Sequence, residues 1–228
     1  AHFVPQSRPR LFVVAISQDC GEACKGREPQ QPWHTAALQR AYGLLPPTLA
    51  EKWIWWKLPK PSKRRTHFKD IIEEQPESVE WHSARETRDL LSMMSDINLA
   101  KVETAKLSGV RMVGGVYKRT RFHHGIKVQR AEIRFDDIAG CLRTPAGGSS
   151  RQLILTVDGN KVRSRLISSR ETARLMGLPD SYKLPSGYNE AYHLTGDGVA
   201  VPVVRYIAKH LIEPVITSHR THEKVAAL

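Results

Sequence analysis

Three polar residues at alternate positions near the start of the chain could hold an anionic group. These are Gln6, Arg8 and Arg10, followed by the apolar run 11–16. Alternation along an extended chain places both arginines on the same side. Two neighbouring guanidinium groups offer planar, permanently charged donors, which suit a phosphate or an anionic, flipped-out base. Alone the pattern is weakly specific, because paired arginines before a strand are common.

The charge of the chain favours a polyanionic partner. Its net charge is +12 over 228 residues. Cations that neutralise phosphates release counterions, so such a surface binds nucleic acid with a steep salt dependence. Clustering favours nucleic acid over a membrane or an acidic protein. The clusters are Lys57, Lys60, Lys63, Arg64, Arg65 and Lys69, then Lys118, Arg119, Arg121, Lys127, Arg130 and Arg134, and finally Lys161, Arg163 and Arg165.

A glycine-bearing loop over 139–152 could contact bases directly. Gly147 and Gly148 allow the backbone to approach DNA closely, and Arg151 and Gln152 could bond the edges of guanine or adenine. An ordinary glycine turn remains the alternative for any single base contact. The predicted DNA-contacting residues are Arg130, Arg143, Thr144, Gly147, Gly148, Ser149, Arg151 and Gln152.

The densest pattern lies at 165–182. Ser168 and Glu171 have the spacing of a capping box, which predicts a short helix. Arg170 and Arg174 then lie four apart on one helical face. We interpret Arg170, Glu171 and Arg174 as scaffold first and as phosphate contacts second.

Several motifs together resemble the DNA cytosine-5 methyltransferases. The segment 6–10 reads Gln-x-Arg-x-Arg, the loop 139–152 is similar to the family's Thr-Leu loop with its glycines, and 196–199 looks like its Gly-Asn-Ser-Val. The most specific is 165–182, which matches Arg-x-Leu/Ile-Ser/Thr-x-Arg-Glu-x-Ala-Arg-Leu-x-Gly-x-Pro-Asp-x-Tyr. The resemblance runs from about residue 3 to residue 213.

The resemblance implies roles for individual residues. Arg10 would bond O2 of a flipped cytosine, while Gln6 and Arg8 would shape the catalytic pocket. The turn before the last helix would help close the S-adenosylmethionine pocket, through Gly196, Asp197, Gly198 and Val199. A helix N-terminus there suits a carboxylate ligand.

The chain departs from the family pattern at several positions. Ser169 replaces the usual proline, and Cys141 stands at a usual threonine. Asp197 and Gly198 replace asparagine and serine, which puts the cofactor contact in doubt. The Pro-Cys, Glu-Asn-Val and Phe-x-Gly-x-Gly motifs do not occur, and no cysteine follows a proline. In the family these supply the nucleophile, the acid and the cofactor loop, so we expect the chain to be inactive alone.

Other side chains that could bind metal are interpreted conservatively. Cys20 and Cys24 lack a second ligand pair for zinc. The pair at 123–124 is expected to be solvated or DNA-facing, and the aspartates at 136–137 to cap a strand end. Three cysteines make no disulfide framework, and with no long apolar run or signal peptide they indicate a reducing cytosol.

Periodicity and turn residues predict the elements that position these groups. Strands are expected at 11–16, 110–117, 128–135, 153–157 and 161–167, the last two joined by a tight Asp-Gly-Asn turn. Helices are expected at 35–44, from a capping box at Ser83 to Gly109 with a break near Ser95, from 168 to Gly177, and from about 199 to 212 before Pro214. Trp53, Trp55 and Trp56 could stack on bases but more often anchor an irregular segment to a core.

The sequence therefore predicts a mixed α/β chain: a target-recognition domain with hairpins and helices, flanked by pieces of a Rossmann-like methyltransferase domain. Residues 1–17 and 196–228 would belong to the catalytic domain and 18–195 to the recognition domain. The expected function is the recognition part of a bacterial, cytoplasmic DNA cytosine-5 methyltransferase, with duplex DNA and the N-terminal catalytic half as partners and no membrane. A non-catalytic DNA-binding protein and an RNA-directed relative remain alternatives.

Overall fold

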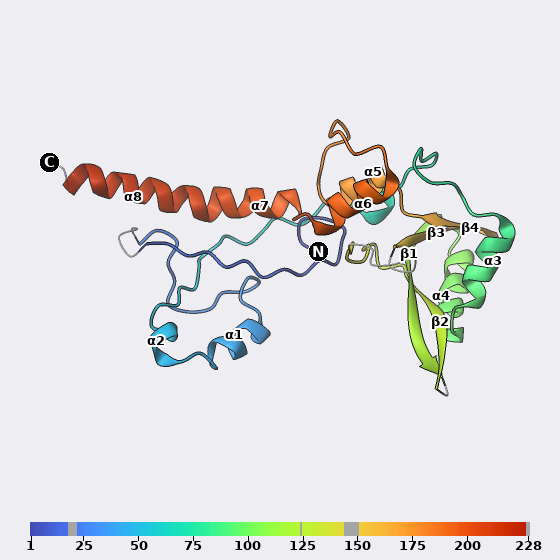
Figure 1. The fold of residues 1–228 in the computed structure, drawn as a ribbon, viewed down its shortest axis with the longest axis horizontal. Coiled ribbons are helices and arrows are strands. Elements are labelled where there is room, and N and C mark those ends of the chain that lie inside the picture. Colours follow the sequence, from blue (N-terminus) through green and yellow to red (C-terminus); the bar gives the residue numbers. More distant parts are fainter. Residues whose placement is uncertain (18–21, 124, 144–150, 227–228) are drawn as a thin grey trace. The chain divides into compact units, whose positions relative to one another are not determined.

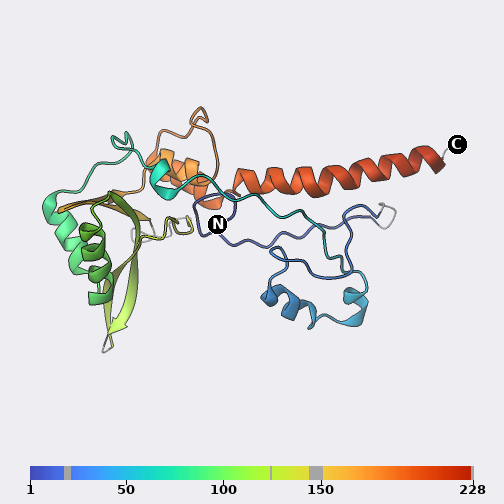
Figure 2. The same ribbon diagram turned by 180° about the vertical axis from the view of Figure 1, so that it is seen from behind.

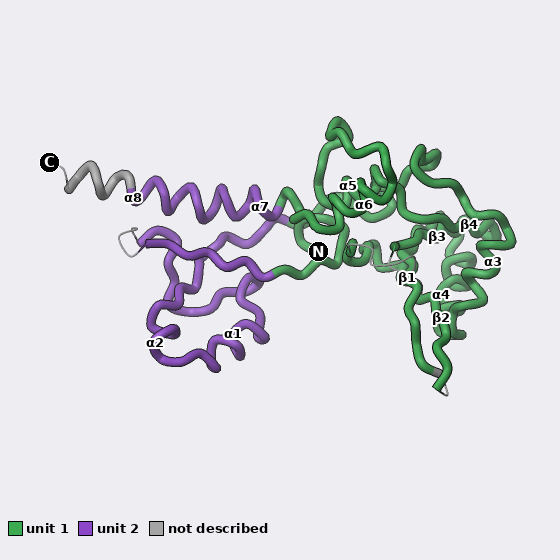
Figure 3. The backbone as a smooth tube through the Cα atoms, in the orientation of Figure 1, with its two compact units in different colours: residues 1–10, 63–202 green, residues 11–62, 203–228 purple. Residues whose placement is uncertain are grey.

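The computed structural model describes residues 1–17, 22–123, 125–143 and 151–226, which form two compact units (Figure 3). Unit 1 contains residues 1–10 and 63–202, and unit 2 contains residues 11–62 and 203–228. These boundaries differ from those that the sequence predicts for the catalytic and recognition segments. That assignment of segments stays a prediction.

Unit 1 is built on a four-stranded antiparallel sheet, which confirms the predicted mixed α/β class with hairpins (Figure 1). Its strands are β1 (Met112–His123), β2 (Ile126–Arg134), β3 (Leu153–Asp158) and β4 (Lys161–Leu166), in the order β2-β1-β3-β4. The predicted tight turn joins β3 to β4, and Gly159 there adopts φ +53°, where glycine is preferred.

Two helices cover one face of this sheet, α3 (Ala84–Ser92) and α4 (Asp96–Leu107). The predicted capping box starts α3: Glu86 N–H donates to Ser83 Oγ, and Ser83 N–H donates to the Glu86 carboxylate. Apolar side chains from both helices, the turn between them and three strands form the core, including Leu90, Met94, Val102, Val116, Ile133, Leu155 and Val157. Ile97, near the start of α4, is 74% exposed and lies outside this core.

The opposite face carries shorter elements, η1 (Phe68–Ile71), α5 (Ser169–Leu175) and α6 (Tyr188–Asp197). Phe68 packs against the backbone of Gly115, the neighbour of the core residue Val116, so it lies on the other side of β1. The capping box predicted for α5 is present, with Glu171 N–H donating to Ser168 Oγ. The sequence did not predict α6.

A buried ion pair ties α5 to β4. Arg165 donates from Nη1 to Glu171 Oε2 at 2.8 Å and from Nη2 to Oε1 at 2.6 Å, and both side chains are fully buried. Arg163 lies over the Trp81 ring at 4.1 Å. The third basic cluster is therefore wrong as an exposed surface. Lys161, Arg163 and Arg165 share one face of β4, but at Arg165 that face is covered by Trp81 and by Glu171 of α5.

Unit 2 contains α1 (Ala36–Tyr42), α2 (Pro47–Ala50), most of α7 (Val201–Ile207), the π-helical turn η3 (Ala208–Ile212) and α8 (Glu213–Ala226). The tryptophans anchor its irregular segment, which confirms the structural interpretation of them. Trp55 is buried among aromatic rings of His34, Tyr42 and Trp53. Trp56 Nε1 donates to the Val14 carbonyl at 3.2 Å.

Two predictions in this unit are wrong. Residues 11–16 form no strand, and Leu11 and Val13 are largely exposed, because no described strand lies beside them to complete a ladder. The last helix begins at Val201 and does not stop before Pro214. Glu213 N–H bonds to the Ala208 carbonyl across a π turn just before Pro214, and the helical run continues past the proline as α8.

Candidate functional site

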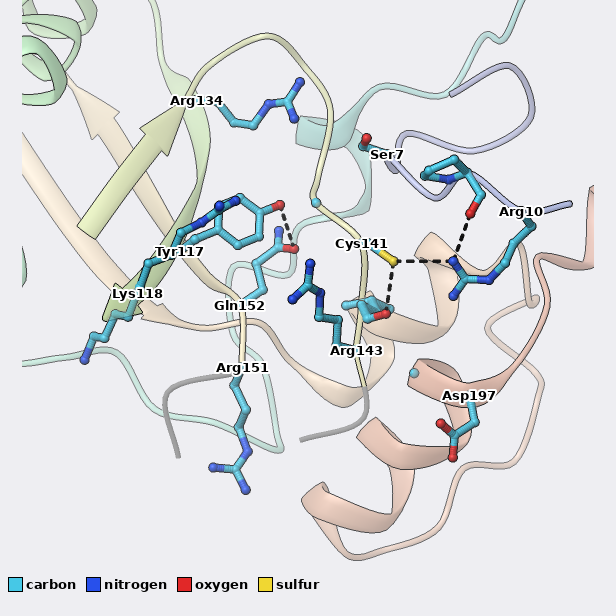
Figure 4. A pocket seen from close by; sticks show the side chains of 15 residues that line it. Ser7, Arg10, Tyr117, Lys118, Arg134, Cys141, Arg143, Arg151, Gln152 and Asp197 are labelled. Atoms are coloured by element: carbon cyan, nitrogen blue, oxygen red, sulfur yellow. Dashed lines mark hydrogen bonds between the residues drawn. The ribbon is translucent and has the colours of Figure 1, made fainter. Parts of the chain in front are cut away.

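An open pocket of about 790 Å³ lies in unit 1 (Figure 4). It is lined by residues of the N-terminal motif, the second basic cluster, the glycine loop and the predicted cofactor turn. Its walls come from the N-terminal segment, strands β1 and β2, the residues on either side of the glycine loop, and the end of α6. Predicted site residues that line it are Arg10, Arg143, Arg151, Gln152, Gly196 and Asp197.

The N-terminal segment is fixed by a short bridge to residue 139. Ser7 N–H donates to the Ala139 carbonyl and Ala139 N–H donates to the Pro5 carbonyl, both at 2.8 Å. Between these bonds the buried Gln6 donates from Nε2 to the Leu175 carbonyl at 2.9 Å, and its Oε1 accepts from Leu142 N–H at 3.1 Å. Gln6 thus joins the N-terminal segment to α5 and to the start of the glycine loop.

Arg8 clamps two further segments through backbone carbonyls. Its guanidinium donates to Leu142 at 2.8 Å, to Gly196 at 2.6 Å and to Gly198 at 2.7 Å. Burial, and after it the charge of Arg10, lowers the pKa of Arg8. A cation at the carbonyl end of α6 also complements the helix dipole. The side chain of Arg8 is therefore committed to holding the pocket walls.

Arg10 differs from Arg8 in facing the pocket. Its Nη1 donates to the Pro9 carbonyl at 2.9 Å and lies 4.0 Å from Cys141 Sγ, and the side chain is exposed (Figure 4). Two arginines of the same motif thus have different positions, one inside the wall and one at the surface of the pocket.

Tyr117 on β1 is a pocket residue that sequence reasoning missed. Its ring packs directly on the backbone of Gly140: a Cβ placed on Gly140 would lie 1.1 Å from the Tyr117 hydroxyl oxygen. Burial raises the pKa of Tyr117 to about 12. Strand alternation, which puts Tyr117 on the same side as Gly115, is the signal that could have found it.

Gln152 is only 2% exposed, although it was predicted to read base edges. Its backbone N–H donates to Tyr192 Oη at 3.1 Å, and its Oε1 accepts from Tyr117 Oη at 3.4 Å. The Nε2 atom is buried without a hydrogen-bond partner in the described structure. Its neighbour Arg151 lies over the Tyr188 ring at 5.7 Å and donates to Asn189.

The predicted cofactor segment is placed differently from the expectation. Gly196 and Asp197 are the last residues of α6 and Gly198 is its C-cap, so the turn follows one helix instead of capping the next. The carbonyls of Gly196 and Gly198 accept from Arg8, and Gly198 N–H donates to the Leu194 carbonyl. The polar backbone atoms of this turn are therefore largely used within unit 1.

Several predicted residues lie elsewhere. Thr144, Gly147, Gly148 and Ser149 fall outside the described residues, as do Cys20 and His124. Arg130 lies on β2 opposite Arg119, on the part of the hairpin that projects from the sheet. Asp137 accepts from Phe68 N–H at 2.7 Å. Among the described residues, no three His, Cys, Asp or Glu side chains gather as a metal site.

Six cations and one carboxylate line this pocket, a balance of charge that suits an anionic partner. The family model for the C-5 cytosine-specific DNA methylases matches residues 3–213. The chain belongs to this family.

Curated relatives agree with this assignment. The chain is 30% identical to the Type II methyltransferase M.HhaI of Haemophilus parahaemolyticus over 156 residues, which are 68% of this chain and 42% of that protein. It is 41% identical to the Type II methyltransferase M.HpaII of Haemophilus parainfluenzae over 54 residues, 24% and 15% of the two chains. It is 34% identical to the DNA (cytosine-5)-methyltransferase CMT2 of Oryza sativa subsp. japonica over 73 residues, 32% and 5%. The matches thus cover less than half of each relative. None of the described helices is long and apolar enough to span a membrane.

Proposed function

We propose that these residues form the DNA-recognition part of a DNA cytosine-5 methyltransferase and contribute one arginine to its catalytic pocket. The observation that carries the proposal is the convergence of Arg10, Arg143, Arg151 and Asp197 on one cation-rich pocket. Family membership supports this reaction class, since the family is that of the C-5 cytosine-specific DNA methylases and one relative is named a DNA (cytosine-5)-methyltransferase.

In this proposal the pocket receives duplex DNA with one cytosine turned out of the stack. Arg10, which faces the pocket, donates to O2 of that cytosine, and Arg8 holds the walls that position it. Lys118, Arg143 and Arg151 draw in the phosphodiester backbone. Segments 1–17 and 196–228 would belong to the catalytic domain, and 18–195 to the recognition domain.

S-adenosylmethionine would supply the methyl group that is transferred to C5 of cytosine. The residues of this chain do not fit that cofactor as a complete site, because Arg8 occupies the carbonyls of Gly196 and Gly198. Asp197 and Val199 could form only part of a wall. The cysteine nucleophile and the Gly-rich cofactor loop have no counterpart in the sequence. We therefore infer that the chain binds DNA but does not methylate it alone.

The first test is binding of the purified chain to mixed-sequence duplex DNA over a range of salt concentrations. We expect log K to fall linearly with log salt, with a slope of about −0.9 for each phosphate neutralised. The variant Arg143→Met/Arg151→Met should weaken binding, whereas Lys25→Met, which removes a cation already paired with Glu22, should not. Failure of the wild-type chain to bind duplex DNA at low salt would contradict the proposal.

The second test concerns the reaction. Labelled S-adenosylmethionine and duplex DNA are incubated with the chain alone and with a separately supplied N-terminal half that carries the Pro-Cys motif. Methylation only in the mixture supports the proposal, and methylation by the chain alone contradicts it. Preference for transfer RNA in a competition experiment would favour the RNA-directed alternative.

A further inference from the structure

Two short segments flank the glycine loop, and each carries one arginine of the pocket. The first stem is residues 139–143, which ends at Arg143, and the second stem is residues 151–152, which begins at Arg151. Residues 144–150 separate the stems along the chain, and a segment of that length can span any distance up to about 25 Å. Chain connectivity therefore does not fix the position of one arginine relative to the other.

Each stem is anchored to a different part of unit 1. In the first stem, Leu142 N–H donates to Oε1 of Gln6 in the N-terminal segment at 3.1 Å. In the second stem, Gln152 N–H donates to Tyr192 Oη on α6 at 3.1 Å, and the Gln152 carbonyl accepts from Ile167 N–H at 3.0 Å. These bonds hold each stem in place but do not join one stem to the other.

Tyr117 of β1 contacts both stems. Its ring packs on the backbone of Gly140 in the first stem, where any side chain larger than hydrogen would collide with it. Its hydroxyl donates to Gln152 Oε1 in the second stem at 3.4 Å, which is long for such a bond, so the ring contributes more than the hydroxyl (Figure 4). In both views α3 and α4 lie on one side of the sheet and the first stem lies on the other (Figures 1 and 2).

The sheet fixes Tyr117 relative to the second stem. Val116 of β1 pairs with Leu153, the first residue of β3, so Tyr117 and Gln152 follow directly as the next opposed residues. On its other side Tyr117 pairs with Glu132 of β2. The backbone of Tyr117 is thus held by the sheet, and its ring extends that fixed frame to the first stem.

We propose that Tyr117 is a positioning residue for Arg143 and Arg151. Its ring holds the first stem in a fixed place relative to the second, so that the two arginines are arranged for the phosphodiester backbone before DNA binds. Arranging groups in advance removes part of the entropic cost of binding. Tyr117 carries no charge at neutral pH, and it acts through the arginines. The inference rests on the proposed function and adds a residue that supports DNA binding from within the pocket wall.

Duplex binding by the full chain tests the inference, at a temperature where circular dichroism shows every variant to be folded. Tyr117→Ala should weaken binding about tenfold, because the first stem loses its contact with the sheet. The same variant should lower the magnitude of the salt slope by about one although it removes no charge, because displaced arginines neutralise fewer phosphates. Tyr117→Phe keeps the ring on Gly140 and should retain nearly the wild-type affinity and slope.

The matched control is Phe135→Ala. The half-buried Phe135 ring packs against the core under α3 and α4, on the other face of the sheet from Tyr117. Its loss should lower the free energy of unfolding but should leave the affinity and salt slope of the folded chain unchanged. A second arm places Tyr117→Ala in the Arg143→Met/Arg151→Met variant. There it should have no further effect, because the side chains that it positions are absent.

Three results would overturn the inference. Tyr117→Ala might bind duplex DNA with the affinity and slope of the wild type, or Phe135→Ala might weaken binding as much as Tyr117→Ala. The third result is an equal effect of Tyr117→Ala with and without the two arginines. All three leave the proposed function standing, because the wild-type chain still binds. A wild-type chain that binds no duplex at low salt contradicts the proposed function, and the inference fails with it.

Discussion

Replacing Glu171 by glutamine should destabilise unit 1 strongly. Each carboxylate oxygen accepts two hydrogen bonds: Oε1 from Arg165 at 2.6 Å and from Glu73 N–H at 2.7 Å, and Oε2 from Arg165 at 2.8 Å and from Ser168 N–H at 2.7 Å. Glutamine keeps one oxygen and turns an NH₂ group toward two donors. It also leaves the buried guanidinium without its counter-ion.

The expected cost follows from this geometry. Removing one partner of a buried ion pair costs about 3–5 kcal/mol, because the remaining charge is desolvated and uncompensated. That is a large fraction of the about 5–15 kcal/mol by which a typical domain is stable. Replacing both partners by apolar residues, as Arg165→Met/Glu171→Leu, should recover much of the loss.

Urea unfolding followed by circular dichroism measures the effect, with Glu103→Gln as the control. Glu103 pairs with Lys106 at 2.7 Å on the exposed surface of α4, and its loss should cost about 0.5 kcal/mol or less. The reasoning is refuted if Glu171→Gln costs no more than Glu103→Gln. It is also refuted if the double variant is less stable than Glu171→Gln alone.

Three further outcomes are expected. Gly140→Ala should lower the free energy of unfolding by about 1–3 kcal/mol, because its Cβ would meet the Tyr117 ring. Tyr117→Ala in the same chain should relieve that clash, as thermal unfolding of the wild type, the two single variants and the double variant can show. Arg8→Met should lower the free energy of unfolding by about 2–4 kcal/mol, because it leaves three carbonyls without a donor. Arg10→Met should change that free energy by no more than about 0.5 kcal/mol but should reduce methyl transfer when the N-terminal half is supplied. Burial raises the Tyr117 pKa from 10 to about 12, so its contribution to stability is complete below pH 10 and is lost as pH rises toward 12. Tyr117→Phe should reduce this loss in unfolding measured at several pH values, and an equal loss in the variant would contradict the assignment.

Local signals predicted most elements of unit 1. The serine and glutamate pairs at 83 and 86 and at 168 and 171 start helices as expected, because a cap is satisfied within one turn. The Asp-Gly-Asn turn fixed the register of β3 and β4. The helix α6 was not predicted, although its buried residues Ala191, Tyr192 and Thr195 have helical spacing.

The sequence by itself determined the family, the caps and turns, and which residue types could contact DNA. Only the tertiary structure decided which of those residues face the pocket. Arg8 and Arg10 look equivalent in sequence. Yet Arg8 donates hydrogen bonds to carbonyls of residues more than 130 positions away, whereas Arg10 donates to the carbonyl of its neighbour Pro9. Arg165 joins a basic cluster in sequence and a buried ion pair in the fold. Short-range hydrogen bonds can be read from spacing, but the direction of a side chain depends on partners that the chain brings together only on folding.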